Sequence, residues 1–167
     1  MAEPEGFREF VDTHSRALLR AGWLLTGDWA SAEDLVQTAL AAAWRRWDRA
    51  AVSPEGYVRA IMTTTYLGWR RRRWVGERPT DVLPDRAGSD AYAEVDVRHA
   101  VLDCLAVLSR QQRAAVVLRY FADLSEAQTA AAMGCSVGAV KSHTARALAR
   151  LRDEPALAAV FRGGVTP

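Results

Sequence analysis

Apolar side chains recur at steps of three and four residues through the first half of the chain. The stripe is clear at residues 7–26, again at 33–47 and a third time at 57–74. This spacing predicts three amphipathic helices, because it places the apolar side chains on one face of a helix. A Thr-Gly-Asp break separates the first two, and Ser31 with Asp34 three residues later resembles a capping box that starts the second.

Shorter helical patterns follow in the second half. Residues 97–108 have helical apolar spacing, and Ser109 can cap a further helix that runs to about residue 120. Ser125 and Gln128 form a capping-box pattern, and Ser136 follows a Met-Gly-Cys turn as the cap of a last helix. No segment alternates with the period of a strand, so the sequence predicts an all-α protein.

The segment between these halves has a different composition. Residues 76–96 contain Gly, Pro and Ser with an excess of acidic residues, which is typical of a flexible linker and is long for a loop inside one domain. We therefore expect two small helical domains joined by a flexible acidic linker, with domains at 7–75 and 97–153 and a short tail at 154–167. A chain of 167 residues can supply two such cores.

Charge is distributed unevenly along the chain. The net charge is only +2, but residues 59–78 carry a net +5 and residues 141–152 a net +4, while 79–96 carry a net −4. Lys141 is the only lysine, so arginine supplies the rest of the positive charge. Two basic blocks on separate helices predict contact with nucleic acid, which the total charge alone would not.

The two capped helices after residue 125 have the pattern of a helix-turn-helix. Ala130 is small where the helices must cross, Gly134 can adopt the left-handed turn, and Val140 points back to the core. The first turns of such a second helix enter the DNA major groove, where Lys141 can donate to guanine. The predicted DNA-binding residues are Ser136, Val137, Gly138, Lys141, Ser142 and Arg146. The alternative is a helical hairpin with a solvated basic face.

Two other predicted helices carry polar faces that could either bind a partner or simply meet solvent. Segment 57–74 combines aromatic residues with an Arg run, which suits single-stranded nucleic acid because bases stack on rings while Arg neutralises phosphates. Its aromatics could equally belong to the core. Segment 33–47 presents Asp34, Gln37 and Thr38 opposite its apolar stripe, where an ordinary solvated face is the alternative.

Three segments together resemble one family. DLVQTA at 34–39, SPEGYVR at 53–59 and VGAVKSHTARAL at 137–148 occur in the order seen in RNA polymerase sigma factors of the extracytoplasmic-function (ECF) type. That family has domains 2 and 4 and lacks domains 1.1 and 3. The resemblance covers about residues 7–153, and the Arg-rich, Lys-poor composition is similar to that of an actinobacterial SigE-like subfamily.

The resemblance implies a role for each segment. The first would bind core polymerase at the β′ clamp helices, through Asp34, Gln37, Thr38 and Trp44. The second would bind the melted −10 element, through Ser53, Arg59, Thr63, Thr64, Trp69, Arg70, Arg71, Arg72 and Arg73. The C-terminal domain would bind the −35 element and the β flap. Thr64 stands where the family often has Asn.

The implied protein initiates transcription in the cytoplasm with promoter DNA and core polymerase as partners, and an anti-sigma protein is a further candidate partner. We expect no catalysis and no cofactor. We expect no metal site, because Cys104 and Cys135 match no metal spacing. We expect no membrane insertion, because no apolar run reaches about 18 residues. Two alternatives remain open. One is an autonomous helix-turn-helix regulator that acts without polymerase, and the other is a helical bundle that sequesters a partner.

Overall fold

The computed structural model describes residues 4–50, 52–69 and 91–155, and their regular structure is helical. The N-terminal module contains α1 (Phe7–Thr26), α2 (Trp29–Trp44), the short 3-10 helix η1 (Trp47–Ala50) and α3 (Pro54–Gly68). The C-terminal module contains α4 (Ala91–Ala106), α5 (Arg110–Val116), the π-helical turn η2 (Val117–Phe121), α6 (Glu126–Met133) and α7 (Val137–Arg152). The predicted all-α class is confirmed for this part of the chain.

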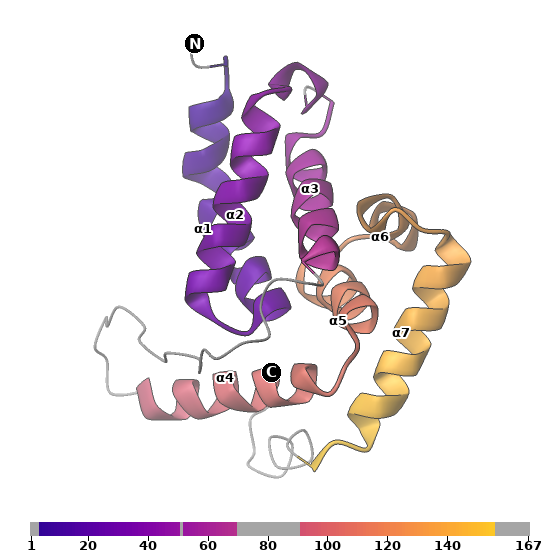
Figure 1. Ribbon diagram of the computed structural model, residues 1–167. Coiled ribbons are helices and arrows are strands. Elements are labelled where there is room, and N and C mark those ends of the chain that lie inside the picture. Colours follow the sequence, from indigo (N-terminus) through magenta and orange to yellow (C-terminus); the bar gives the residue numbers. More distant parts are fainter. Residues whose placement is uncertain (1–3, 51, 70–90, 156–167) are drawn as a thin grey trace.

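The N-terminal module is a three-helix bundle (Figure 1). Helices α1 and α2 lie side by side and approach closely at Gly22, where an added Cβ would come within 3.3 Å of the Ala32 carbonyl oxygen. Helix α2 begins at Trp29, because the Asp28 side chain accepts a hydrogen bond from the Ser31 amide at 2.8 Å. The predicted capping box at Ser31 is therefore wrong. Asp28 takes the cap position, and Ser31 is buried in the first turn.

The boundaries of the other helices can also be compared with those predicted from the sequence. Helix α3 has Pro54 in its first turn, as predicted, and its last residue is Gly68. The rest of that predicted helix, residues 70–74, lies outside the described residues. Helix α4 begins at Ala91, so residues 91–96, predicted to belong to the linker, are helical here. The other linker residues, 76–90, are also outside the described part.

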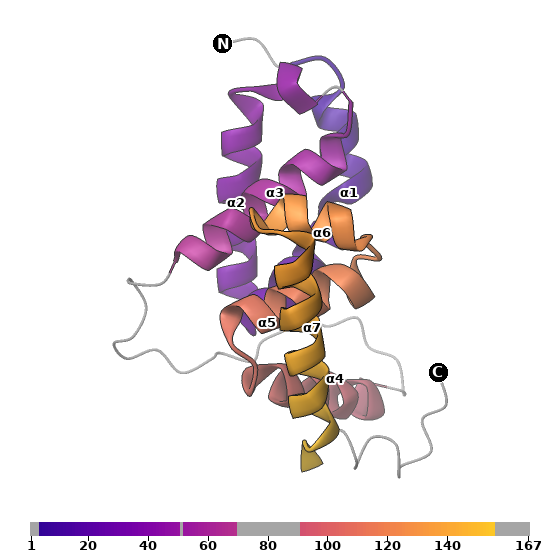
Figure 2. The ribbon, with the colours of Figure 1, turned by 90° about the vertical axis from the view of Figure 1, so that its right-hand side faces the viewer.

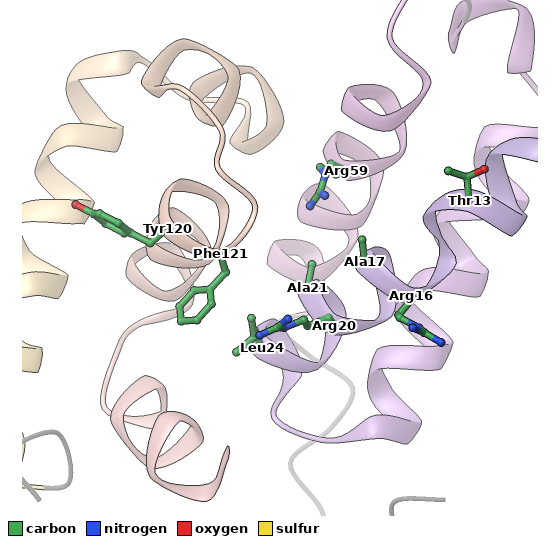
Figure 3. A pocket seen from close by; sticks show the side chains of 9 residues that line it. All are labelled: Thr13, Arg16, Ala17, Arg20, Ala21, Leu24, Arg59, Tyr120 and Phe121. Atoms are coloured by element: carbon green, nitrogen blue, oxygen red, sulfur yellow. The ribbon is translucent and has the colours of Figure 1, made fainter. Parts of the chain in front are cut away.

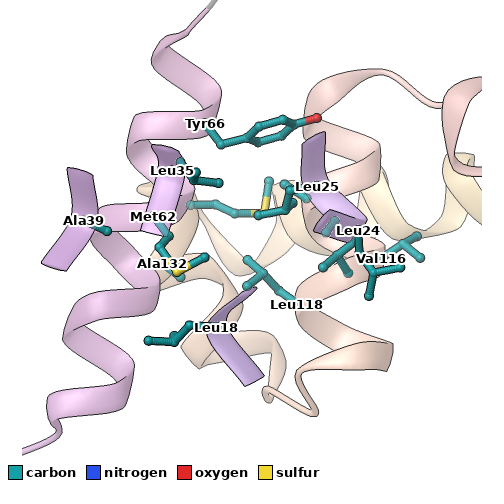
Figure 4. Packing of buried hydrophobic residues seen from close by; sticks show 14 of the residues in the cluster. Leu18, Leu24, Leu25, Leu35, Ala39, Met62, Tyr66, Val116, Leu118 and Ala132 are labelled. Atoms are coloured by element: carbon teal, nitrogen blue, oxygen red, sulfur yellow. The ribbon is translucent and has the colours of Figure 1, made fainter. Parts of the chain in front are cut away.

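The two modules share a hydrophobic core (Figure 4). Leu18, Leu24 and Met62 of the N-terminal module are at most 2% exposed, and so is Leu118 of η2. Figure 4 shows these side chains directed into one cluster with Ala132 of α6. Burying a leucine fully contributes about 1.5–3 kcal/mol, so the contact between the modules is part of this arrangement's stability. The sequence pattern predicts two domains but does not show that buried side chains join them.

Helix α7 lies on the outer side of the C-terminal module. It packs on α5 and α6, while α5 and α6 pack on α3. Figure 2 looks onto this side and shows α7 in front of α5. The predicted DNA-reading helix is thus positioned away from the bundle, whereas α3 of the N-terminal module packs against the C-terminal module.

Candidate nucleic-acid interface

The helix-turn-helix is built by three local signals. Ser125 and Gln128 form the predicted capping box, with the Gln128 amide 3.1 Å from the Ser125 hydroxyl and the Ser125 amide 2.8 Å from the Gln128 side chain. Gly134 ends α6 at φ 64°, a left-handed conformation that favours glycine. Ser136 then caps α7 by accepting from the Ala139 amide at 3.1 Å. These three predictions are confirmed.

Burial of one face of α7 fixes which side chains face outward. Val140 and Ala147 are fully buried against the module. The six residues predicted to bind the −35 element are all exposed around the first turns of the helix: Ser136, Val137, Gly138, Lys141, Ser142 and Arg146. The Lys141 side chain is 63% exposed, and its Nζ lies 3.5 Å from Glu126 Oε2 at the start of α6. Their roles at DNA remain predictions.

Two threonine hydroxyls inside this module are unsatisfied. Thr129 is fully buried, and neither its Oγ1 nor that of Thr144 has a hydrogen-bond partner among the described residues. A buried hydroxyl without a partner costs about 1–3 kcal/mol. A threonine side chain has the branched shape of valine, so each residue can fill its site while its oxygen stays unpaired.

The residues predicted for the −10 element are divided between surface and interior. Ser53 and Thr64 are exposed, and Trp69 is half-buried against the core. Arg59 and Thr63 are 7% and 0% exposed. Both side chains are buried in the free chain, and their contact with a melted strand remains a prediction. The four arginines at 70–73 lie outside the described residues.

Arg59 is held by an ion pair within α3. Its Nη2 and Nε lie 2.6 and 3.1 Å from Glu55 Oε1, and the Arg59 backbone carbonyl accepts from the Thr63 hydroxyl at 2.8 Å. Glu55 is also 3.8 Å from His14 Nε2 on α1. The pair neutralises Arg59 in its buried position, so this guanidinium is oriented before any ligand arrives.

The predicted polymerase-binding face of α2 is mostly open. Asp34, Gln37 and Thr38 are exposed and, at three- and four-residue spacing, lie on one side of the helix. Trp44 is half-buried, and its ring meets that of Phe7 edge-on at 4.8 Å. Trp44 thus packs within the bundle, and the other three residues form the accessible surface.

A cleft of about 620 Å³ separates the modules beside α3 (Figure 3). Arg16 and Arg20 of α1 and Arg59 of α3 line one side, and the exposed rings of Tyr120 and Phe121 line the other. Its described lining contains no acidic residue, so the cleft has a positive potential. The sequence pattern assigns none of Arg16, Arg20, Tyr120 and Phe121 to a site.

Two more arginines, which the sequence pattern does not single out, connect the modules. Arg113 of α5 donates from Nε to the Leu24 carbonyl at 2.7 Å, and Arg110 donates from Nη1 to the Tyr66 carbonyl at 2.9 Å. Burial lowers the pKa of Arg113 and raises that of Tyr66, and the nearby arginines oppose the rise. Arginine stays protonated at neutral pH in proteins, so Arg113 keeps its positive charge. The sequence feature that could have indicated these two arginines is their spacing in RQQR, residues 110–113, beside apolar residues.

Comparisons with known proteins agree with this geometry. Residues 10–75 match the family model "Sigma-70 region 2", and residues 98–151 match "Sigma-70, region 4". The chain is 43% identical over 150 residues to the RNA polymerase sigma-E factor of Streptomyces avermitilis, covering 89% of this chain and 84% of the relative. It is 31% identical to the ECF RNA polymerase sigma factor SigL of Mycobacterium tuberculosis, over 90% of this chain and 89% of that one.

A solved structure shares the fold across both modules. The sigma factor RpoE from Bartonella quintana, solved in complex with the anti-sigma factor NepR, superposes with a TM-score of 0.72 at 26% identity, covering 90% of this chain and 96% of that one. The chain therefore belongs to the sigma-70 family of RNA polymerase sigma factors. Its similarity to SigL places it in the extracytoplasmic-function group of that family.

Two further observations concern the described residues alone. No group of three His, Cys, Asp or Glu side chains among them could hold a metal ion. None of their helices combines the length and the apolar character needed to cross a bilayer.

Proposed function

We propose that this chain binds core RNA polymerase in the cytoplasm and directs it to promoters with −35 and −10 elements, without catalysing a reaction itself. The observation that carries the proposal is the presence on one chain of both sigma regions, in order, with the basic face of α7 exposed. A second DNA-contacting region distinguishes this function from that of an autonomous helix-turn-helix regulator. Residues 7–75 and 97–153 act as the two functional domains.

Helix α7 is proposed to read the −35 element in the major groove. Lys141 and Ser142 are exposed near its N-terminus, the part that enters the groove in helix-turn-helix proteins. Lys141 can donate to guanine O6 or N7, and Arg146, one turn further, can reach phosphate oxygens. The Glu126 carboxylate beside Lys141 limits the charge that the free helix presents.

The N-terminal module is proposed to bind polymerase and the melted −10 strand. Asp34, Gln37 and Thr38 face outward on α2, where they can meet the β′ clamp helices. The segment between η1 and α3, which includes exposed Ser53, would hold a base flipped from the stack. Arg59, Thr63, Thr64, Trp69 and the arginines at 70–73 would line the strand, and the C-terminal module would also contact the β flap.

An anti-sigma protein is a proposed regulator. The support is the Bartonella quintana RpoE structure, whose title names an anti-sigma factor as its partner. The positive cleft with its exposed rings offers charge and apolar surface to such a protein. Coexpression of the chain with acidic helical proteins encoded beside it, followed by affinity purification, would identify a stable complex.

Selection from a randomised duplex pool tests the proposed function. One arm uses the chain reconstituted with core polymerase and the other uses the chain alone. We expect the first arm to enrich two conserved blocks at fixed separation, and the second to enrich neither at the same protein concentration. Enrichment of one identical block in both arms would instead identify an autonomous regulator. Failure to associate with core polymerase would favour a bundle that sequesters another partner.

A further inference from the structure

The cleft between α1 and η2 has two chemically different walls. Arg16 and Arg20 belong to the α1 wall, and the aromatic ring of Phe121 belongs to the η2 wall (Figure 3). The cleft volume of about 620 Å³ lies within the range of pockets that hold small organic ligands, about 300–1,000 Å³. The cleft is therefore large enough for one small molecule that contacts both walls.

The two α1 arginines carry unpaired positive charge. Both are exposed, and neither has a hydrogen-bond or ion-pair partner among the described residues. They are four residues apart on one helix, so they lie on the same side and their like charges repel. An anion that accepts hydrogen bonds from both guanidinium groups would remove this repulsion and form charge-assisted contacts.

Arg59 contributes less charge to the cleft than these two arginines. Its guanidinium is already paired with Glu55 Oε1 at 2.6 Å, and Arg59 is 7% exposed. The described lining contains no carboxylate that would oppose an anion. The charge of the preferred ligand is therefore set by Arg16 and Arg20, and two positive charges match a phosphate monoester, which carries nearly two negative charges at pH 7.

The opposite wall presents an aromatic face. Phe121 is 48% exposed. Figure 3 shows its ring directed toward Arg20, whereas the Tyr120 ring is directed away from α1. Apolar Ala21 and Leu24 line the cleft between these groups. A flat ring stacked on Phe121 would remove its exposed face from water, so the ligand should carry an aromatic group as well as a phosphate.

The backbone at this wall has an unusual conformation. Residues Val117–Phe121 form a π-helical turn, which is a rare element that occurs frequently at functional sites. Asp123, directly beyond it, has a φ of 52° and is the only non-glycine residue with positive φ in the described part of the chain. This local geometry sets the position from which Phe121 enters the cleft.

We propose that the cleft binds a nucleoside phosphate, with the phosphate on Arg16 and Arg20 and the base stacked on Phe121. Inorganic phosphate has no ring for Phe121, and a nucleoside has no charge for the arginines, so each of them uses one wall alone. Stacking is tolerant of base identity, and we therefore expect little discrimination among bases. The site goes beyond the proposed function, which assigns the cleft to a protein partner. A bound nucleotide would exclude that partner from the cleft.

Isothermal titration calorimetry of the full chain tests the site with AMP and GMP. Adenosine and inorganic phosphate are the matched partial probes, because each carries one of the two recognised groups. We expect both nucleotides to bind at least about tenfold more tightly than either partial probe. Inorganic phosphate bound as tightly as AMP would show a general anion site and would overturn the proposal, as would equal binding of adenosine and AMP.

Variants assign the two walls. R16A/R20A should lose about tenfold or more in AMP affinity. R45A/R46A removes the same charge from exposed positions directly after α2 and should lose less than about threefold. F121L keeps an apolar side chain without an aromatic face and should lose about fivefold or more. Equal losses in the two arginine variants would indicate long-range charge and would contradict the site.

The replaced side chains are all exposed, so circular dichroism melting should show folded variants. The comparison of probes on the wild-type chain remains decisive if a variant does not fold. A single-stranded oligonucleotide without a terminal phosphate gives the last comparison. If it binds with an affinity that F121L reduces while AMP does not bind, the cleft contacts nucleic acid strands and the nucleotide site is overturned.

The site and the proposed function can fail separately, because the titrations use neither polymerase nor promoter DNA. A chain that binds AMP as expected but initiates no transcription would retain the site and lose the proposed function. A chain that initiates transcription but binds neither AMP nor GMP would lose the site alone.

Discussion

Lys141, the single lysine of the chain, lies on α7 with its Nζ 3.5 Å from the Oε2 of Glu126, the first residue of α6. Both side chains are substantially exposed, at 63% and 41%, so the attraction is weak in water. The pairing nevertheless matters for recognition. A DNA phosphate or base can replace the carboxylate as the partner of Lys141, which lies beside Ser142 on α7.

Replacement of Lys141 by alanine should weaken binding to −35 duplex DNA. If the contact is to a base, the loss is about 1–3 kcal/mol and is largest for the preferred sequence. Competition binding of the holoenzyme with matched and mutated −35 duplexes measures it. Arg152→Ala, at the far end of α7, is the control for lost charge. An unchanged sequence preference would remove Lys141 from the interface.

Replacement of Glu126 by glutamine should have the opposite effect on DNA. The substitution removes a carboxylate that competes with phosphate for Lys141, so affinity should rise by up to several-fold at low salt. Folding stability should change by less than about 1 kcal/mol, because the ion pair is exposed. Salt titrations of duplex binding show the effect, which should vanish in the Lys141→Ala background. A gain that persists there would assign Glu126 a different role.

Thr129→Val should stabilise the protein. The valine methyl group replaces a fully buried hydroxyl that has no hydrogen-bond partner, and the expected gain is about 1 kcal/mol. Thr63→Val is the matched control, since Thr63 is equally buried but donates to the Arg59 carbonyl. Thermal melting should show the first variant above the wild type and the control at or below it. A lower melting temperature for Thr129→Val would show that its hydroxyl is satisfied in solution.

Asp34→Arg should impair association with core polymerase while leaving the fold intact. Asp34 is exposed on the same side of α2 as Gln37 and Thr38, and charge reversal at an interface typically costs more than tenfold in affinity, an estimate of about 1.4 kcal/mol or more. Asp12→Arg on α1 makes the same charge change at another exposed site. Gel filtration or biolayer interferometry with core polymerase compares the two. An equal loss of affinity in both variants would indicate a long-range electrostatic effect rather than a direct contact of Asp34 with polymerase.

Local chemistry explains which parts of the fold could be predicted from the sequence. Ser109, Ser125 and Ser136 all cap helices as predicted, because each cap depends on residues three positions away. The start of α2 was misplaced, since Asp28 and Ser31 are both good caps and the sequence does not show which one occupies the position. The outward face of α7 was predictable from the buried Val140.

Contacts between the modules were not predictable in this way. The carbonyl that Arg113 meets is 89 residues away, and a backbone acceptor leaves no trace in residue identity. Arg59 and Thr63 are 7% and 0% exposed, and the sequence pattern identified α3 as polar and aromatic without showing that part of it faces inward. The shared core of Leu24 and Leu118 likewise follows from tertiary docking.

Run-off transcription with purified core polymerase tests the central claim most directly. Templates would carry the duplexes selected by the reconstituted holoenzyme, and start sites would be mapped on each transcript. The proposed function predicts transcripts that begin at one position downstream of the two selected blocks, only when the chain is added, and that are lost when either block is mutated. Transcripts that are identical with and without the chain would contradict it.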